Sequence, residues 1–415
     1  MKEDKDHQSI KTYLVGGAVR DQLLGIKVIE RDWVVVGATA KAMLDQDFQQ
    51  VGKDFPVFLH PESKEEYALA RTEIKDGSGH TGFQVHASAD VTLEQDLLRR
   101  DLTINAIAKD DAGRLIDPYN GLGDINKRLL RHVSDAFTED PLRVLRVARF
   151  HAKLLHLGFT VADETLALMK DISRSGELNT LSPERVWQEF RKGLNETSPQ
   201  AFIQTLYQCG ALEELLPELN RCFHNNDNML DVSSSIGKRT LTALEYAAKQ
   251  HYAGEIRWAI VLHAIDSNSR PKNIIAKVIS KKSDSDNAIK MISERLRVPN
   301  DYGELASLVA YYIEFAIQAK ASKPDIIISL LDICDAWRRP DRFQAFLQSC
   351  EALISTSPER SHQNLGSIAF LRTAHERCKQ VDAKEFIAAG ISGEAIGESI
   401  RNARKVCIAE LKQQF

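Results

Sequence analysis

The pattern of apolar residues changes once along this chain, close to Asp140, and this change limits the folds open to it. From Tyr13 to about residue 135, short β-rich runs such as WVVVG, VFLH and INAIAKD alternate with polar stretches. After Asp140, apolar residues recur at helical spacing, as in LRVLRVARFHAKLLHLGF. We therefore predict an α+β protein in which a small mixed sheet with packed helices precedes an all-helical remainder.

The bulk composition excludes little. With 415 residues the chain is long enough for about two to four packed units. Its formal charge of −4 gives no overall positive field, so a nucleic-acid partner would need local basic patches. Six scattered cysteines without a C-x-x-C pair are typical of a reducing compartment, and we expect a cytoplasmic protein. No apolar stretch approaches the roughly 20 residues of a membrane span.

Two acids stand at the start of the run VIERDWVVVG, residues 28 to 37. In a strand Glu30 and Asp32 project to the same side, while Arg31 points away. Two carboxylates on one face repel each other unless a cation lies between them, and oxygen-only sites suit Mg²⁺. The alternative is a solvated strand end without a ligand.

A diglycine turn precedes the acid pair and favours the metal interpretation. VGGAVRD places Gly16 and Gly17 between a predicted strand and a predicted helix, where free backbone N–H groups attract anions. Arg20, one turn into that helix, can bind a phosphate. Glu73 at the end of EYALARTE is a candidate third acid that faces the metal or the nucleophile, or else an ordinary surface acid.

Four further stretches follow GGAVRDQLLG in order: RRDLTINA (99–106), DPYNGLGDINKRLLR (117–131), EDPLRVLRVARF (139–150) and LSPERVWQEF (181–190). Together they resemble the bacterial class II tRNA nucleotidyltransferase (CCA-adding enzyme) family, to which bacterial poly(A) polymerases are related. The resemblance implies a nucleotidyltransferase head of the polymerase beta-like type at 1–138. It implies a helical neck at 139–200, a helical body at 201–330 and a helical tail at 331–415 that binds tRNA.

The resemblance implies a template-independent enzyme that adds C, C and A to the 3′ end of tRNA from CTP and ATP. The tRNA 3′-hydroxyl attacks the α-phosphate, and two Mg²⁺ ions assist. Family roles then fall on Glu30 and Asp32 as metal ligands, with Glu73 as a further catalytic candidate. The resemblance assigns nucleotide binding to these positions: Gly17, Arg20, Arg100, Asp101, Asp140, Arg143, Arg146 and Arg149.

The pair Asp140 and Arg143 has a physical argument of its own. Three residues apart on a helix, the two side chains share a face and can present an acceptor and a donor fork to one base edge. Cytosine and adenine each offer an amino donor beside a ring acceptor, whereas guanine and uracil reverse that order. The pair can therefore select C and A without a template. Ser182, Pro183 and Arg185 indicate a helix start, with a mainly structural role.

The chain departs from the family pattern at two places. Most relatives carry Asp-x-Asp where this chain has Glu30 and Asp32, and the extra methylene moves the carboxylate by about 1.5 Å, which predicts reduced activity. Related proteins often hold an HD-type metal phosphohydrolase in their helical body. Here WAIVLHAIDSNSRP keeps His263 but has Ala264 in place of the Asp, so we predict no phosphohydrolase activity.

Two alternatives stay open at this point. Poly(A) polymerases usually carry a longer basic C-terminal extension than this chain, which ends at Phe415. A catalytically weakened paralogue would bind tRNA or nucleotide without efficient turnover. RNA contact is expected from local basic clusters such as RNARKVC (401–407) and SKKSD (280–284), each of which can also be a solvated face. The sequence leaves monomer and homodimer equally open.

Overall fold

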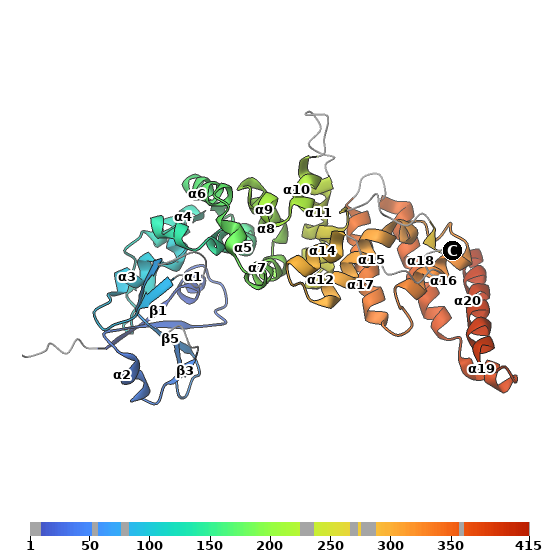
Figure 1. The fold of residues 1–415 in the computed structure, drawn as a ribbon, viewed down its shortest axis with the longest axis horizontal. Coiled ribbons are helices and arrows are strands. Elements are labelled where there is room, and N and C mark those ends of the chain that lie inside the picture. The colour runs from blue at the N-terminus through green and yellow to red at the C-terminus, as the bar shows by residue number, and fades with distance from the viewer. Residues whose placement is uncertain are drawn as a thin grey trace, which may run out of the picture. The chain divides into compact units, whose positions relative to one another are not determined.

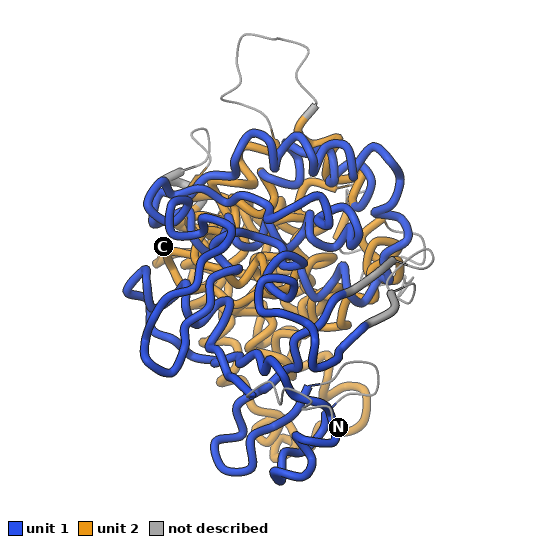
Figure 2. Tube along the Cα trace, turned by 90° about the vertical axis from the view of Figure 1, so that its left-hand side faces the viewer, with its two compact units in different colours: residues 1–189, 205–215 blue, residues 190–204, 216–415 orange. Residues whose placement is uncertain are grey.

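The chain divides into two compact units, coloured separately in Figure 2. The structure, a computed structural model, describes residues 10–51, 57–75, 83–224, 236–265, 273–274, 288–356 and 361–414. Unit 1 comprises residues 1–189 and 205–215, and unit 2 comprises residues 190–204 and 216–415. The boundary falls within two helices, and the four-part division stays a prediction.

A seven-stranded mixed sheet in unit 1 confirms the predicted head (Figure 1). Its order is β3-β4-β5-β2-β1-β8-β9, and β2 runs parallel to β5 while the other neighbours are antiparallel. The strands are β1 (Lys11–Val15), β2 (Asp32–Val36), β3 (Gln49–Val51), β4 (Val57–Leu59), β5 (Glu66–Leu69), β8 (Ala108–Lys109) and β9 (Leu115–Ile116). A separate hairpin pairs β6 (Thr72–Lys75) with β7 (Phe83–His86).

Alternation along β2 places its residues in two different cores. Val34 packs with Leu97 and its neighbours, and Val35 packs with Met43 and Phe58. Because side chains two apart share a face, Asp32 projects to the side of Val34 and Leu97. That side carries α3 (Leu93–Leu98) and the short 3₁₀ helix η1 (Thr103–Asn105), which position the site described below.

The remaining helices of unit 1 follow the predicted periodicity. α5 (Leu142–Leu154) buries its apolar residues and carries Lys153 in its last turn, where a cation complements the helix dipole. One prediction is wrong in detail, because β11 (Thr160–Val161) pairs with β10 (Leu129–Leu130) after the strand signals stop. The other helices are α1 (Gly17–Leu23), α2 (Ala40–Leu44), α4 (Gly121–Lys127), η2 (Asp135–Glu139), η3 (Leu155–Leu157), α6 (Asp163–Arg174), η4 (Glu177–Thr180) and α9 (Ala211–Leu215).

Unit 2 is helical throughout its described residues. α7 (Pro183–Asn195) and α8 (Pro199–Gln208) begin in one unit and end in the other. The others are α10 (Pro217–His224), α11 (Ile236–Lys249), α12 (Gly254–Leu262), α14 (Ala288–Arg295), α15 (Asn300–Ile317), α16 (Pro324–Ile333), α17 (Pro340–Ser355), α18 (Ser361–Lys379), α19 (Ala383–Ala388) and α20 (Glu394–Gln414). Phe190 packs edge-to-face on Phe202 and Trp258, with centroids 5.1 and 6.1 Å away.

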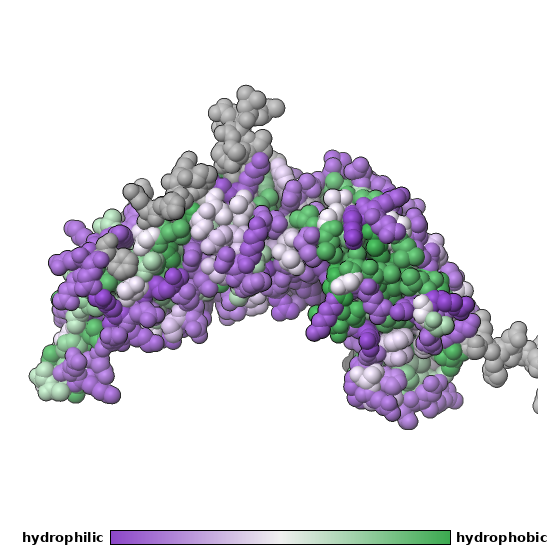
Figure 3. Space-filling view, turned by 180° about the vertical axis from the view of Figure 1, so that it is seen from behind, coloured by the Kyte–Doolittle hydropathy of each residue, from purple (hydrophilic) through white to green (hydrophobic). Residues whose placement is uncertain are grey.

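The surface shows where apolar residues gather. On the face in Figure 3, hydrophobic residues collect over part of unit 1, while hydrophilic residues cover much of unit 2. Within the described residues, no helix is both long and apolar enough to cross a lipid bilayer.

Candidate functional site

Asp32, the second residue of the acid pair, lies beside the diglycine turn. β1 pairs with β2 so that Val15, the residue just before the turn, is the Cα partner of Asp32. Gly16 has φ of +68°, a conformation that side chains other than glycine rarely adopt. A Cβ at Gly16 would lie 2.8 Å from Nη1 of Arg100. Glycine is therefore favoured at position 16 for two reasons: the backbone conformation and the close approach of a guanidinium.

The two carboxylates interact with each other and with Arg100. Partial desolvation raises the pKa of Asp32, the positive charge of Arg100 opposes this rise, and the negative charge of Glu30 adds to it. β2 begins only at Asp32, so the expectation that Glu30 lies within the strand is wrong; Glu30 occupies the loop before it. Arg31 donates to Glu65, which also accepts from Trp33; that Arg31 points away from Asp32 stays a prediction.

The carboxylates of Glu30 and Asp32 suit a hard divalent cation. Within the described part of the chain, no hydrogen-bond donor or ion pair contacts the carboxylate of Glu30 or Asp32, and two unpaired carboxylates of one sign favour a cation between them. Across the described residues as a whole, there is no group of three or more His, Cys, Asp or Glu side chains that could hold a metal ion. Glu73 lies in β6, outside the seven-stranded sheet; its side chain falls outside the described residues, and its role stays a prediction.

Arg100 is held in place by Asp96. Its Nη2 donates to Asp96 Oδ2 at 3.2 Å and its Nη1 to the Asn105 carbonyl at 3.3 Å. Asp96 is fully buried and also accepts two bonds from Arg99. Burial alone would raise the pKa of Asp96, but the charges of Arg99 and Arg100 lower it below its usual value. Among the described residues, none is a hydrogen-bond partner of the buried Nε of Arg100.

Asp101 joins the head to α5. Its Oδ1 accepts from the Leu102 N–H and from Asn105 Nδ2, and its Oδ2 accepts from Arg146 Nε and Nη2 at 2.8 and 2.6 Å. Burial would raise the pKa of Asp101, but the charge of Arg146 and the hydrogen bonds from Asn105 and Arg146 lower it far below its usual value. Asp101 is therefore an anion at neutral pH, and a ribose hydroxyl would have to replace one of these donors.

Arg20 is a buried residue of α1. It donates from Nε to Asp21 Oδ1 at 2.8 Å and from Nη1 to Asn105 Oδ1 at 2.6 Å. Lys153 of α5 donates to the other oxygen of Asp21 at 2.9 Å. Arg20 and Gly17 thus lie on the first helix, directly after the turn, and Arg20 is fixed by contacts to η1 and to Asp21.

The geometry expected for Asp140 and Arg143 is wrong in one respect. α5 begins at Leu142, so Asp140 precedes the helix and accepts from the Leu142 N–H. Its second oxygen accepts from Arg185 of α7 at 2.9 Å. Arg143 instead donates to the carbonyls of Ala136 and Arg99. Arg185, which sequence analysis treated as structural, is therefore the ion-pair partner of the predicted base-reading carboxylate.

Arg149 has a partner of its own. Its Nε donates to Glu189 of α7 at 2.7 Å, and Glu189 is buried. Together with Arg146 on Asp101, this makes two predicted phosphate-binding arginines that contact buried carboxylates in the structure. Whether they also contact nucleotide stays a prediction.

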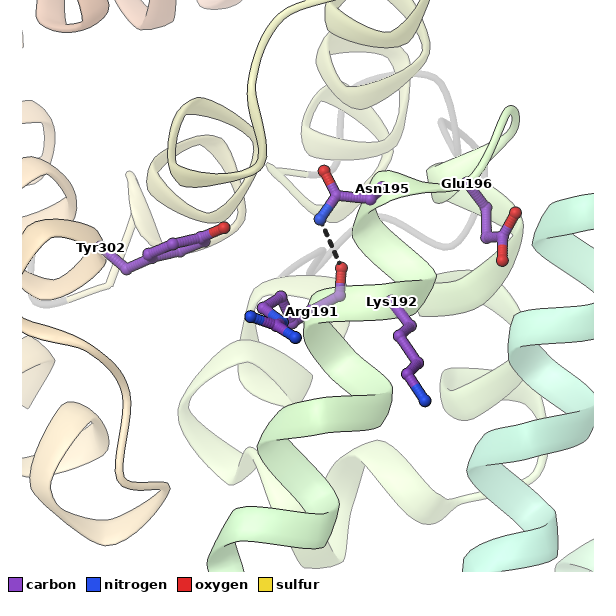
Figure 4. Close-up of a pocket in the computed structure, with 5 residues that line it drawn as sticks. All are labelled: Arg191, Lys192, Asn195, Glu196 and Tyr302. Carbon is purple, nitrogen blue, oxygen red and sulfur yellow. Dashed lines mark hydrogen bonds between the residues drawn. The ribbon is translucent and has the colours of Figure 1, made fainter. Parts of the chain in front are cut away.

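Unit 2 contains a pocket of about 380 Å³ on the C-terminal part of α7. It is lined by Arg191, Lys192, Asn195, Glu196 and Tyr302. In Figure 4, Arg191 lies on the same side of α7 as Tyr302, whereas Lys192 and Glu196 point away from that ring. Arg191 and Lys192 are exposed, so the rim of the pocket offers two cations to an anionic ligand.

Two predicted features of the helical region can also be located. His263 follows α12, and its Nδ1 lies 2.8 Å from the carbonyl of Ile260; the absence of phosphohydrolase activity stays a prediction. In the basic run 401–407, Arg401 and Lys405 pair with Asp332 and Asp325 of α16. Arg404 lies 3.6 Å from the Trp337 ring centroid, so this cluster fastens α20 within unit 2. The run 280–284 lies outside the described residues.

Several residues that build the site were not predicted from the sequence. Asn105 contacts Arg20, Arg100 and Asp101. Asp96 lies just outside the quoted motif RRDLTINA. An asparagine inside the apolar run TINAIA was the available signal, because a polar residue in a buried run needs partners.

The sheet, the glycine turn and the acid pair define the head of a nucleotidyltransferase. Residues 12–131 match the family model described as the poly A polymerase head domain, and residues 158–223 match a "probable RNA and SrmB-binding site of polymerase A". The Multifunctional CCA protein of Thioalkalivibrio sulfidiphilus is 48% identical over 407 residues, which cover 98% of this chain and 100% of that protein. The Multifunctional CCA protein of Hahella chejuensis is 47% identical, with coverages of 97% and 96%. The chain belongs to the family of CCA-adding nucleotidyltransferases that includes these two proteins.

Solved structures support the same fold. A CCA-adding enzyme in its apo form II has a TM-score of 0.66 at 20% identity and covers 97% of this chain and 88% of its own. The Thermotoga maritima CCA-adding enzyme complexed with tRNA has a TM-score of 0.63 at 19% identity, with coverages of 98% and 91%. At these identities the likeness shows the fold, a mixed-sheet head with a mostly helical remainder.

Proposed function

We propose that this chain adds C, C and A to the 3′ end of tRNA, taking the nucleotides from CTP and ATP without a nucleic-acid template. The observation that carries the proposal is the pairing of Val15 with Asp32, which sets this carboxylate directly beside the glycine turn, with the charge of Glu30 acting on it from the loop before the strand. A catalytic acid pair must lie next to the triphosphate site for nucleotidyl transfer. Membership of the CCA protein family supports the same reaction.

The metal-holding residues of the proposed site are Glu30 and Asp32. Enzymes of this class use a divalent metal, and we propose Mg²⁺ because both ligands are carboxylates. When bound, the metal activates the attacking hydroxyl and stabilises the leaving oxygens. Partial burial is the main cause of the raised pKa of Asp32, and the charge of Glu30 adds to it; a cation between the two carboxylates would favour their ionised forms.

The triphosphate of the incoming nucleotide would lie against the turn. Arg100, whose Nη1 is packed against Gly16, and Arg20 on the following helix supply positive charge there. Arg146 and Arg149 of α5 supply more. Asp101 is ionised and could accept a ribose hydroxyl in exchange for one of its present donors.

Base selection is proposed for the start of α5. Asp140 would accept from the exocyclic amino group of cytosine or adenine, and Arg143 would donate to the ring acceptor beside it. In the structure Arg185 holds the Asp140 carboxylate, and the carbonyls of Ala136 and Arg99 hold Arg143. Both side chains are therefore oriented before a nucleotide arrives, which is the condition for selection without a template.

The tRNA partner requires basic surface. The segment 158–223, which matches an RNA-binding family model, contains the exposed residues Arg191 and Lys192 beside the unit 2 pocket. Phosphate contacts from such cations would make binding weaken steeply as salt rises. A tRNA substrate and the scattered cysteines together favour a cytoplasmic location.

An extension assay tests the proposal. Purified protein is incubated with tRNA that lacks its terminal CCA, with Mg²⁺ and labelled CTP or ATP. Ordered addition of C, C and A supports the proposal. Runs of A would indicate a poly(A) polymerase, and binding of tRNA without extension would indicate a weakened paralogue; either result would refute it.

A further inference from the structure

One buried aromatic ring in α5 is surrounded by three guanidinium groups. Phe150 is 7% exposed. The guanidinium carbons of Arg149, Arg20 and Arg146 lie 4.6, 5.1 and 5.8 Å from its ring centroid. Each distance is within the range of about 6 Å in which a cation is attracted to an aromatic ring.

Three cations so close together repel one another, and the structure opposes this repulsion in two ways. Each arginine has its own carboxylate: Arg20 pairs with Asp21, Arg146 with Asp101 and Arg149 with Glu189. These carboxylates come from three different segments: Asp21 from α1, Asp101 from the segment between α3 and η1, and Glu189 from α7. All three guanidiniums share the ring of Phe150, and its negative face attracts cations without accepting a hydrogen bond.

We propose that Phe150 is a positioning residue for nucleotide binding. Its ring orients Arg20 and Arg146. The proposed function places these two arginines at the nucleotide phosphates, and the inference rests on that placement. Phe150 touches no substrate itself. Because Arg20 lies on the helix after the glycine turn and Arg146 lies on α5, the ring links the triphosphate side of the site to the base-reading helix.

An aliphatic side chain of similar size would fill the space but would not attract the guanidiniums. In Phe150→Leu, we expect the affinity for CTP and ATP to fall by about tenfold and KM to rise by a similar factor. This is within the range measured for desolvated cation–π contacts. We expect kcat to change by less than about threefold, because the acid pair is untouched. Phe150→Tyr keeps the ring and is expected to stay near the wild type.

The chain offers a matched control in Phe159. It is fully buried in the same unit, and the guanidinium of Arg128 lies 5.4 Å from its ring centroid. Arg128 is not among the predicted nucleotide-binding residues. Phe159→Leu therefore makes the same substitution and removes a cation–π contact, but should leave nucleotide affinity within about twofold of the wild type.

Fluorinated phenylalanines at position 150 test the electrostatic argument without a change of fold. Successive fluorine atoms reduce and then reverse the negative face of the ring while its shape is nearly kept. CTP affinity is measured by calorimetry on the full chain, with melting temperature as a measure of folding, separately from tRNA extension. A stepwise loss of affinity with fluorination is expected.

The inference is overturned if fluorination leaves CTP affinity unchanged, or if Phe150→Leu weakens it no more than Phe159→Leu. These outcomes are independent of the proposed function. A chain that never extends tRNA but loses CTP affinity stepwise would refute the polymerase function and still support the positioning role.

Discussion

The ion pair of Asp101 and Arg146 should respond unequally to removal of its two partners. Asp101 is 5% exposed, whereas the side chain of Arg146 is 38% exposed. Arg146→Met leaves an ionised carboxylate in the protein interior, with the Leu102 N–H and Asn105 Nδ2 as its remaining donors within the part of the chain that the structure describes. Asp101→Asn leaves a guanidinium that water can reach.

The difference can be given a magnitude. Removing one partner of a buried pair costs about 3–5 kcal/mol when the remaining charge is buried. Loss of a partner by a charge that stays hydrated costs about 1 kcal/mol, and the asparagine can still accept hydrogen bonds. We therefore expect Arg146→Met to lower the free energy of unfolding by about 2–4 kcal/mol more than Asp101→Asn.

Equilibrium urea unfolding of both variants at pH 7 and pH 5 is the assay. In the wild type the lowered pKa of Asp101 gives stability that is present above the unfolded pKa and is lost only as pH falls through the folded value. Without Arg146, burial raises that pKa, so the penalty should shrink as pH falls from 7 to 5. Equal costs for the two variants, or a penalty in Arg146→Met that does not change with pH, would refute the reasoning.

Three further predictions concern single positions. Glu30→Asp should raise the rate of CMP and AMP incorporation, by up to about 10²-fold if the longer side chain misplaces the carboxylate; an unchanged steady-state rate would contradict that displacement. Gly16→Ala should destabilise the fold by about 1–3 kcal/mol and raise KM for CTP, because its Cβ would displace Arg100. Gly158 also has a positive φ, but no described atom lies within 4 Å of a Cβ there, so Gly158→Ala should lower stability without changing KM. Burial lowers the pKa of His151 to about 4, so the unfolded state takes up a proton first as pH falls below about 6.5. Measured by urea unfolding, a change from pH 7 to pH 5 should therefore lower the free energy of unfolding of the wild type by up to about 2 kcal/mol more than that of His151→Asn. Equal losses in the two proteins would contradict this prediction.

The sequence predicted the elements but not the partners of the site residues. The strand before the diglycine turn, the helix after it and the run WVVVG are all found where the residue pattern placed them. Hydrophobic periodicity depends on near neighbours along the chain, so local sequence carries it. Family motifs then singled out Arg100, Asp101 and Arg146, which the structure brings together.

Contacts over long sequence separations could not be predicted in the same way. Arg185 lies 45 residues from Asp140 and Lys153 lies 132 residues from Asp21, and no local pattern fixes which charged residues of two distant segments will meet. The helical interpretation of Asp140 failed for a different reason, which is local and present in the sequence. Pro141 follows it, and the residue before a proline disfavours helical geometry.

The central claim is that Glu30 and Asp32 hold a divalent metal next to the triphosphate. Mn²⁺ can replace Mg²⁺ and is visible by electron paramagnetic resonance, so its binding can be titrated with a non-hydrolysable CTP analogue present. The account predicts Mn²⁺ bound to the wild type together with the analogue, and binding weakened at least about tenfold in Asp32→Asn at an unchanged melting temperature. Equal binding by the two proteins would contradict it.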